Sequence, residues 1–135
     1  MSQTIRDAMI PEPQTLEATA SAQEAGEHLT QPEVRAVYVC DGERFVGVVT
    51  RKTLVREVVA AGRDPLETKI GEIAEPAHWT LASELPLDQA FQFLEENDAE
   101  RVPVVDDGKL VGVLSRSVLR RRLAEDEPPP PLDEV

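Results

Sequence analysis

The sequence predicts an α+β fold built from two pseudo-symmetric copies of one β-α-β-β-α unit. Three observations lead to this prediction: an ungapped internal repeat, apolar residues spaced for a helix early in each copy, and two short apolar runs joined by a polar turn later in each copy. The chain has 135 residues, of which 41% are hydrophobic and only 4% aromatic. These values suit a compact globular protein with a core of Val, Leu, Ile and Ala.

The repeat is clearest in two segments, FVGVVTRKTL at 45–54 and LVGVLSRSVL at 110–119. Gly47 and Gly112 are 112 − 47 = 65 residues apart, and this offset aligns the two halves without a gap. Such a match indicates two copies of one structural unit. Because two copies are too few for a solenoid, we expect a pseudo-symmetric pair. We therefore expect a first unit at 1–66, a second at 67–124, and an acidic, proline-rich, disordered tail at 125–135.

Each copy is expected to begin with a short strand, at Thr15-Leu16 and at Thr80-Leu81, followed by a helix. Ser21 and Glu24 have the spacing of a capping box, which opens the first helix. Pro86 fits the first turn of the second helix, where its missing N–H has no cost. The apolar residues at helical spacing are Ala22, Ala25, Gly26 and Leu29 in the first copy and Leu87, Ala90, Phe91 and Leu94 in the second.

Two apolar runs follow in each copy: VRAVYVC and FVGVV around the turn DGER, and ERVPVVD and LVGVL around the turn DDGK. Short apolar runs joined by a tight polar turn predict a hairpin. Thr50 and Ser115 are good N-cap residues for a final helix in each copy. The helices are expected to cover one face of a small sheet.

The segment ERVPVVDDGKLVGVLSRSVL (100–119) resembles the CBS (cystathionine β-synthase) domain, and the first copy fits the same pattern less closely. The resemblance implies two CBS units packed through their sheets as a CBS pair, or Bateman module, which commonly forms a homodimer. Such pairs usually act as non-catalytic sensor or regulatory modules. They bind an adenosine-containing ligand (AMP, ADP, ATP or S-adenosylmethionine) in clefts between the units and signal to an effector protein through a conformational shift.

The strand-to-helix junctions are the candidate ligand sites within this pattern. Thr50 and Ser115 stand where helix N–H groups lack partners, and Arg51 and Arg116 follow with a charge that suits an anion such as phosphate. A capping hydroxyl followed by a solvated arginine is the alternative interpretation. The expected contacts to adenine come from Thr15, Leu16, Val37, Tyr38, Thr80, Leu81, Val102 and Pro103.

One position departs from the family pattern in both copies. Nucleotide-binding members carry an Asp there that bonds both ribose hydroxyls, whereas this chain has Thr53 and Val118. Valine accepts no hydrogen bond and threonine makes one without charge, so we favour the cleft lined by Thr50, Arg51 and Thr53. The alternative function is a protein–protein interaction or dimerisation module that has lost nucleotide binding.

Charge and residue content disfavour other classes of function. The net charge of −12 argues against nucleic acid and anionic membranes as partners. The single cysteine, Cys40, permits no intrachain disulfide or zinc cluster, and the absence of a leader or membrane-length apolar run points to the cytoplasm. His28 and His78 have no nucleophile or metal-ligand spacing, so we predict no catalytic residue, metal site or required cofactor. Trp79 is expected to pack where the units meet, with ligand contact as the alternative.

Overall fold

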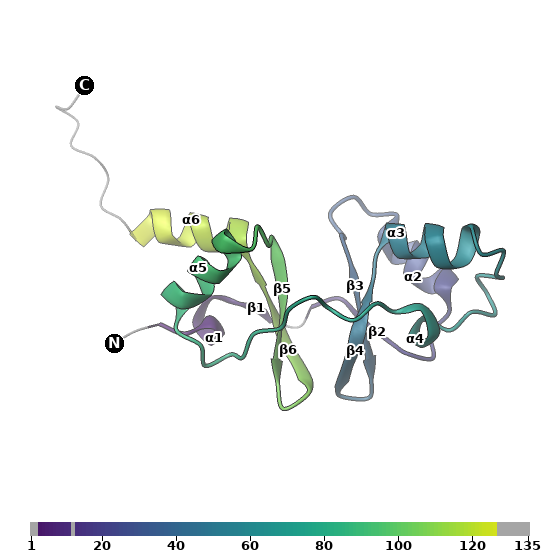
Figure 1. Ribbon diagram of the computed structural model, residues 1–135, viewed down its shortest axis with the longest axis horizontal. Helices are drawn as coiled ribbons and strands as arrows, with labels where there is room; N and C mark the ends of the chain where they lie inside the picture. Colours follow the sequence, from purple (N-terminus) through teal and green to yellow (C-terminus); the bar gives the residue numbers. More distant parts are fainter. Residues whose placement is uncertain (1–2, 12, 127–135) are drawn as a thin grey trace, which may run out of the picture.

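A computed structural model describes residues 3–11 and 13–126, with side chains up to residue 122. Most of the tail expected at 125–135 therefore lies outside the described residues. The strands form one curled six-stranded sheet, whose two halves stand side by side in the middle of the molecule and are joined by the pairing of Arg44 with Lys109. Helices cover the outer side of each half (Figure 1). This layering of helix, sheet, sheet and helix is the α+β arrangement of two units packed through their sheets that the sequence predicts.

Both units follow the expected order of elements. The first unit contains β2 (Thr15–Glu17), α2 (Ala22–Leu29), β3 (Val37–Asp41), β4 (Arg44–Val49), α3 (Arg51–Leu54) and a π-helical continuation, η1 (Val55–Val59). The second contains α5 (Leu87–Glu96), β5 (Arg101–Asp106), β6 (Lys109–Ser115) and α6 (Arg116–Asp126). Short segments lead into each unit: α1 (Ile5–Ala8) and β1 (Ile10–Pro11) precede the first unit, and α4 (Ile70–Ile73) precedes the second.

The expected first strand of the second unit is reduced to one parallel bridge between Leu81 and Val104. In the first unit, β2 pairs with β3, and the Tyr38 N–H donates to the carbonyl of Gln14 (3.1 Å). The repeat places Pro103 at the position of Tyr38. Because proline has no N–H to donate, the ladder of the second unit cannot extend in the same way.

The helix signals of the sequence are largely confirmed. The Ser21 hydroxyl accepts the Glu24 N–H (3.1 Å) at the start of α2. The buried residues of the two helices are those of the expected apolar faces: Ala22, Ala25 and Leu29 in α2, and Leu87, Ala90 and Leu94 in α5. Pro86 lies one position earlier than expected, at the N-cap of α5, where its missing N–H is equally harmless.

The two units exchange their leading segments. Ile5 and Ala8 of α1 belong to the hydrophobic core of the second unit, while Ile70 and Ile73 of α4 belong to the core of the first. The N–H of Ile5 donates to the Leu85 carbonyl (3.0 Å), and β1 pairs with β6 in antiparallel register. Each core is therefore completed by a segment from the other half of the chain. The boundary between the two units that the sequence predicts, at residues 66 and 67, stays a prediction.

The repeated glycines lie where the exchanged segments cross the hairpins. A side-chain carbon on Gly47 would collide with the Glu75 carbonyl, whose carbon would be 2.9 Å away, and one on Gly112 would lie 2.9 Å from the Ile10 carbonyl oxygen. Glu75 and Val48 also exchange both backbone hydrogen bonds at 2.8 Å. Glycine is thus required at both positions because another backbone passes against the strand.

We predict that Gly47→Ala lowers the free energy of unfolding by about 1–3 kcal/mol, because the added methyl group must displace a backbone carbonyl. Chemical denaturation monitored by circular dichroism measures the change. Gly26→Ala is the matched control: Gly26 lies inside α2, and its added carbon would lie 3.7 Å from Leu54 Cδ1 of α3, an ordinary van der Waals contact. This variant should therefore be neutral or stabilising. Equal stability of the two variants would contradict the proposed role of the crossing.

Candidate functional site

Two clefts open between the units, and the 65-residue offset relates them. The larger has a volume of 590 Å³ and the smaller 270 Å³. Arg35, Ala36, Tyr38 and Arg101 line both. The mouth of the larger cleft is formed by His78 and Trp79, and the offset maps these residues onto Pro13 and Gln14 of the smaller cleft.

Three of the site residues expected from the sequence line the larger cleft: Tyr38, Thr50 and Pro103. Their neighbours in the strands explain why. Val37 and Val39 face the helix-covered core of the first unit, and side chains alternate along a strand, so Tyr38 faces the opposite side. Val102 and Val104 are core residues of the second unit, which directs Pro103 into the cleft by the same rule. The cleft is therefore lined by the sheet faces that the helices leave uncovered.

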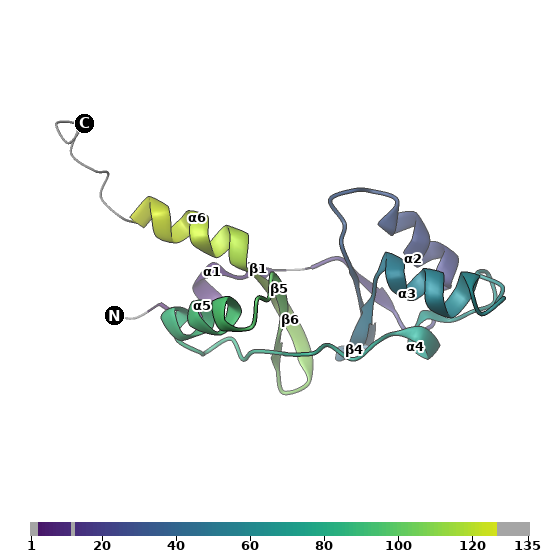
Figure 2. The ribbon, with the colours of Figure 1, turned by 45° about the horizontal axis from the view of Figure 1, so that its top comes forward.

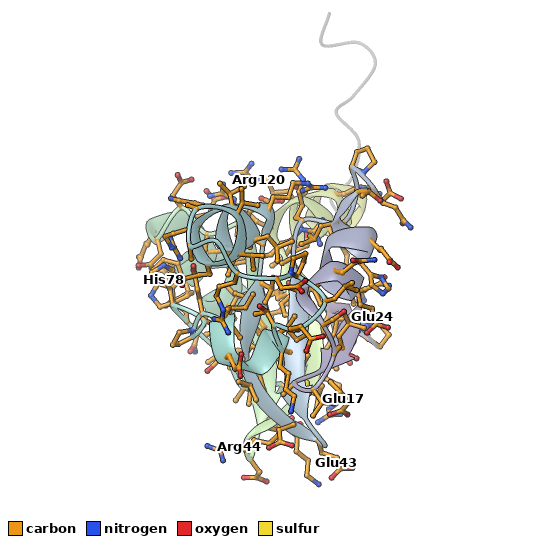
Figure 3. The ribbon with its side chains drawn as sticks, turned by 90° about the vertical axis from the view of Figure 1, so that its right-hand side faces the viewer. Glu17, Glu24, Glu43, Arg44, His78 and Arg120 are labelled. Carbon is orange, nitrogen blue, oxygen red and sulfur yellow. The ribbon has the colours of Figure 1, made fainter. Side chains whose placement is uncertain are left out.

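Other expected contacts to adenine lie elsewhere. Val37 and Val102 are buried in the two cores, with exposed fractions of 0% and 1%. Thr80 is exposed, and Leu81 packs against the second core. Thr15 and Leu16 line a separate groove of 780 Å³, together with Glu17, Glu24 and Glu43. Glu17 and Glu24 lie on the opposite side of the molecule from His78 (Figure 3), so this groove is distinct from the larger cleft.

Thr53, at the position where nucleotide-binding relatives carry an Asp, is completely buried. Its hydroxyl accepts the Thr50 N–H (3.0 Å), and the Thr50 hydroxyl accepts the Thr53 N–H (3.2 Å), which together form a capping box. The two hydroxyl oxygens are 3.0 Å apart. Thr53 therefore uses its hydrogen-bonding capacity to start α3. Val118, its counterpart, donates its N–H to the Ser115 hydroxyl (3.4 Å) and has no side-chain acceptor.

The two arginines expected to bind an anion are occupied by the chain itself. The guanidinium of Arg51 donates to the Gln31 carbonyl (2.8 Å) on the exposed side of α3. Arg116 is only 15% exposed and pairs with Asp98 (3.1 Å) and Glu100 (3.5 Å). The hydrogen bond to Asp98 and the charges of the nearby acids raise the pKa of Arg116 above its ordinary value, so this guanidinium stays charged and held in place.

Two arginines that the sequence did not single out line both clefts. Among the described residues, Arg35 and Arg101 have no ion pair and no side-chain hydrogen bond. Arg101 lies near the Tyr38 phenol: burial raises the pKa of Tyr38, and the Arg101 charge partly offsets this. The repeat conceals the two arginines, because it aligns Arg35 with Glu100 and Ala36 with Arg101. Neither arginine therefore has a basic counterpart in the other half of the chain.

Trp79 packs against the second unit and also lines the larger cleft. Its ring meets Phe93 edge-on, with centroids 5.8 Å apart at 88°, which holds it against the second unit. It is nevertheless 39% exposed and lines the larger cleft beside His78. An aromatic wall fixed on one side and open on the other is suited to a flat ring of a ligand.

Glu100 occupies the N-terminus of α6. Its carboxylate accepts the Ser117 N–H (3.2 Å) and also bonds to the Ser117 hydroxyl. These hydrogen bonds lower the pKa of Glu100, with the Arg116 charge contributing. The position where an anionic ligand would meet this helix therefore already holds an anion of the chain. In the first unit the corresponding residues are Arg35 and Lys52, and neither is acidic.

Among residues 3–11 and 13–122, no group of three or more His, Cys, Asp or Glu side chains is placed to hold a metal ion. In the described part of the chain, no helix has both the length and the apolar character needed to cross a membrane.

Comparison with protein families and curated proteins places the geometry in context. The model of the CBS domain matches the chain twice, over residues 5–60 and 70–125. Hypoxic response protein 1 of Mycobacterium tuberculosis is 31% identical over 129 residues, covering 90% of this chain and 86% of that protein. Its structure with two coordinated zinc ions superposes with a TM-score of 0.74 at 24% identity, over 89% of this chain and 98% of that one.

Solved structures with adenosine-containing ligands bound are also similar. CBSX2 in complex with AMP gives a TM-score of 0.72 at 26% identity and covers 91% of this chain and 97% of that one. The CBS domain pair of protein MJ0100, in complex with 5′-methylthioadenosine and S-adenosyl-L-methionine, gives 0.69 at 21% identity over 94% and 100% of the two chains. At that identity the second likeness concerns the fold alone.

We predict that Thr53→Val lowers the free energy of unfolding by about 1–2 kcal/mol, because the change breaks the capping box and leaves the Thr50 N–H without its acceptor. Urea denaturation measures the change. Val118→Thr, at the equivalent position of the second unit, is the reciprocal control. It should change the free energy of unfolding by less than Thr53→Val does. Unchanged stability of Thr53→Val would show that the hydroxyl is not needed for capping and is free for a ligand.

Proposed function

Because the chain belongs to the CBS domain family, we propose that it is a non-catalytic regulatory module that binds an adenosine-containing ligand in the larger cleft. One observation carries the proposal: this cleft combines aromatic walls from Tyr38 and Trp79 with the two arginines, Arg35 and Arg101, that lack internal partners. The aromatic rings suit a base. The guanidinium groups suit a phosphate or carboxylate. The complex of the similar protein CBSX2 with AMP supports this class of ligand.

The proposed signal is a shift between arrangements of the two units. Thr50 and Tyr38 belong to the first unit, Arg101 and Pro103 to the second, and His78 and Trp79 to the segment that passes between them. A ligand in the cleft contacts all three parts. It stabilises whichever arrangement it binds more tightly, by the difference between its affinities for the two. An effector protein would respond to that arrangement.

The side chains of the larger cleft support a binding role more than a catalytic one. The Thr50 hydroxyl is engaged by Thr53 and the Ser117 hydroxyl by Glu100. No histidine hydrogen-bonds to either hydroxyl in the described structure, and the Glu100 carboxylate at Ser117 has a lowered pKa, which makes it a weak base for activating a nucleophile. The proposal also includes a homodimer and a cytoplasmic setting, the latter suggested by the single cysteine.

The alternative is a protein–protein interaction module that has lost its ligand. Two observations favour it: Thr53 is committed to the capping box, and Glu100 fills the N-terminus of α6. Both remove contacts that a nucleotide could otherwise use. Nucleotide titration of the purified protein separates the two functions, since the interaction module should show no response.

Trp79 is the only tryptophan of the chain, so its fluorescence should report directly on the larger cleft. We predict a saturable change on titration with at least one of AMP, ADP, ATP and S-adenosylmethionine. Arg101→Gln should weaken the binding of a phosphate-bearing ligand about tenfold or more, because it removes a charge-assisted hydrogen bond. It should leave the affinity for adenosine nearly unchanged.

Arg44→Gln is the control for the loss of one positive charge, since Arg44 lies at the far end of the β3–β4 hairpin (Figure 3). It should bind as the wild type does. Equal weakening by both variants would mean that only net charge matters. No response of the wild type to any of the four ligands would favour the interaction module.

We further predict that Glu100→Gln increases the affinity for AMP or ATP several-fold at neutral pH, because it removes a negative charge from the wall of the larger cleft. Glu96→Gln, on the exposed side of α5, makes the same change in net charge away from the cleft and should have little effect. Isothermal titration calorimetry measures both affinities.

The pH dependence follows from the lowered pKa of Glu100. The carboxylate stays ionised down to a lower pH than an ordinary glutamate, so protonation of Glu100 strengthens wild-type binding only below the usual titration range of glutamate. The difference between the wild type and Glu100→Gln should therefore persist at mildly acidic pH. A difference that vanishes there would contradict this assignment.

A further inference from the structure

We propose that the groove beside β2 binds an extended, basic segment of a partner protein, which adds to the edge of the sheet as a further strand. This acidic groove has a volume of 780 Å³, and ligand sites commonly measure about 300–1,000 Å³. The strand β2 lines one side of it, and residues 109–111 of β6 line another. The inference concerns a site outside the two clefts, and it holds whether or not a nucleotide binds in them.

The strand β2 has a free edge. It stands at the end of the sheet and, in the described structure, pairs with β3 alone, in parallel register. The Tyr38 N–H donates to the Gln14 carbonyl (3.1 Å) at one end of this pairing. The Ala18 N–H donates to the Cys40 carbonyl (2.8 Å) at the other end. The backbone groups of residues 14, 16 and 18 therefore face β3, and those of residues 15 and 17 face the open edge, because these groups alternate in direction along a strand.

Three backbone groups on this edge have no backbone partner among the described residues: the N–H and the carbonyl of Thr15 and the N–H of Glu17. The Glu17 carbonyl accepts the Ala20 N–H (2.9 Å). Thr15 can exchange two hydrogen bonds with one residue of an antiparallel strand, and the Glu17 N–H can donate a third. Open edges of this kind are the docking sites of extended peptides that bind by adding a strand to a sheet.

The acidic groove carries negative charge that the chain does not neutralise. Glu24, Glu17 and Glu43 follow one another down one side of the molecule (Figure 3), and all three line the groove. Lys109, the basic residue of the lining, is paired with Glu43 (2.9 Å). Neither Glu17 nor Glu24 forms an ion pair among the described residues. The Gly42 N–H donates to the Glu17 carboxylate (3.0 Å) and holds it at the groove.

These charges favour a basic partner over a second copy of this chain. A basic segment supplies the cations that the two glutamates lack, whereas another copy has a net charge of −12 and is repelled. The lining also includes Leu16, Ala20, Leu110 and Val111, which are apolar. Because side chains alternate along a strand, a segment that alternates Lys or Arg with Val, Ile or Leu can present one kind to the carboxylates and the other to the apolar residues.

The second unit does not repeat the acidic edge. The 65-residue offset puts an uncharged residue at the position of each of the three glutamates: Ala82, Gln89 and Gly108. The strand itself is reduced there to the single bridge between Leu81 and Val104. The site is therefore a property of the first unit and is not part of the repeated pattern.

The first test is the fluorescence anisotropy of a fluorescein-labelled heptapeptide that alternates lysine with valine. The peptide should bind the wild-type chain saturably, and Glu24→Lys should weaken the binding about tenfold or more, since it replaces an attraction by a repulsion. Glu96→Lys is the matched control: it makes the same change in charge on the exposed side of α5 and should bind nearly as the wild type does. Both variants should keep the wild-type circular dichroism spectrum. No saturable binding by the wild type, or equal weakening by the two variants, would overturn the proposal.

The same peptide with N-methyl groups throughout its backbone tests whether the contact is a strand pairing. The methyl groups remove the N–H donors and keep the charges. The modified peptide should bind at least about tenfold more weakly, because the hydrogen bonds to the edge of β2 are lost. Equal affinity of the two peptides would mean that charge alone holds them, which contradicts the added strand.

Amide hydrogen exchange, measured by NMR, locates the pairing. In the free protein the amides of Thr15 and Glu17 should exchange faster than those of Leu16 and Ala18, which bond to β3. The bound peptide should slow exchange at Thr15 and Glu17 about tenfold or more, because a new hydrogen bond must break first. It should leave Leu16 and Ala18 nearly unchanged. Slow exchange at Thr15 and Glu17 in the free protein would mean that a second copy or another segment of this chain covers the edge. That result, or unchanged exchange in the complex, would refute the proposed site.

Discussion

The crossing of two backbones at Gly47 and at Gly112 is the constraint on which the rest of the structure depends. At each crossing a segment from the other half of the chain passes against a hairpin strand, at a distance that no side chain permits. The crossing allows α1 to complete the second core and α4 to complete the first. It also fixes where the connecting segment leaves the first sheet, and so places His78 and Trp79 at the mouth of the larger cleft. The same backbone crossings therefore determine both how the cores are completed and where the candidate site lies.

The repeat in the sequence was sufficient to predict the order of the elements, because helix caps, apolar faces and hairpin turns are local signals that occur twice. The exchange of leading segments was not predictable in this way. Ile5 and Ile70 have the same pattern whether they pack on their own half or on the other, since both cores accept an isoleucine at that position. Only long-range backbone contacts distinguish the two arrangements.

The candidate site was predictable only in part, for a similar reason. The family resemblance named Val37 and Val102 together with Tyr38 and Pro103, and the fold turns only Tyr38 and Pro103 toward the cleft. A sequence also does not reveal which polar groups satisfy one another. Thr53 and Arg116 stand at positions that the family resemblance marks for ligand contact, yet one caps a helix and the other forms ion pairs. Conversely, Arg35 and Arg101 have no counterparts in the repeat, and their importance arises because the described structure leaves them unpaired. Hydrogen-bond satisfaction, which depends on the whole fold, decides between the two groups.

The larger cleft is connected to the outer side of the first unit by one helix (Figure 2). Thr50 caps α3 at the cleft, and Val55 and Val59 lie on η1, the continuation of that helix. A ligand that moves the start of α3 therefore moves η1 as well. Linkage makes the effect reciprocal: any factor by which a binding event at η1 changes ligand affinity must equal the factor by which the ligand changes that event. The cleft also takes Arg101 and Pro103 from the second unit, so the same ligand couples α3 to the arrangement of the two units.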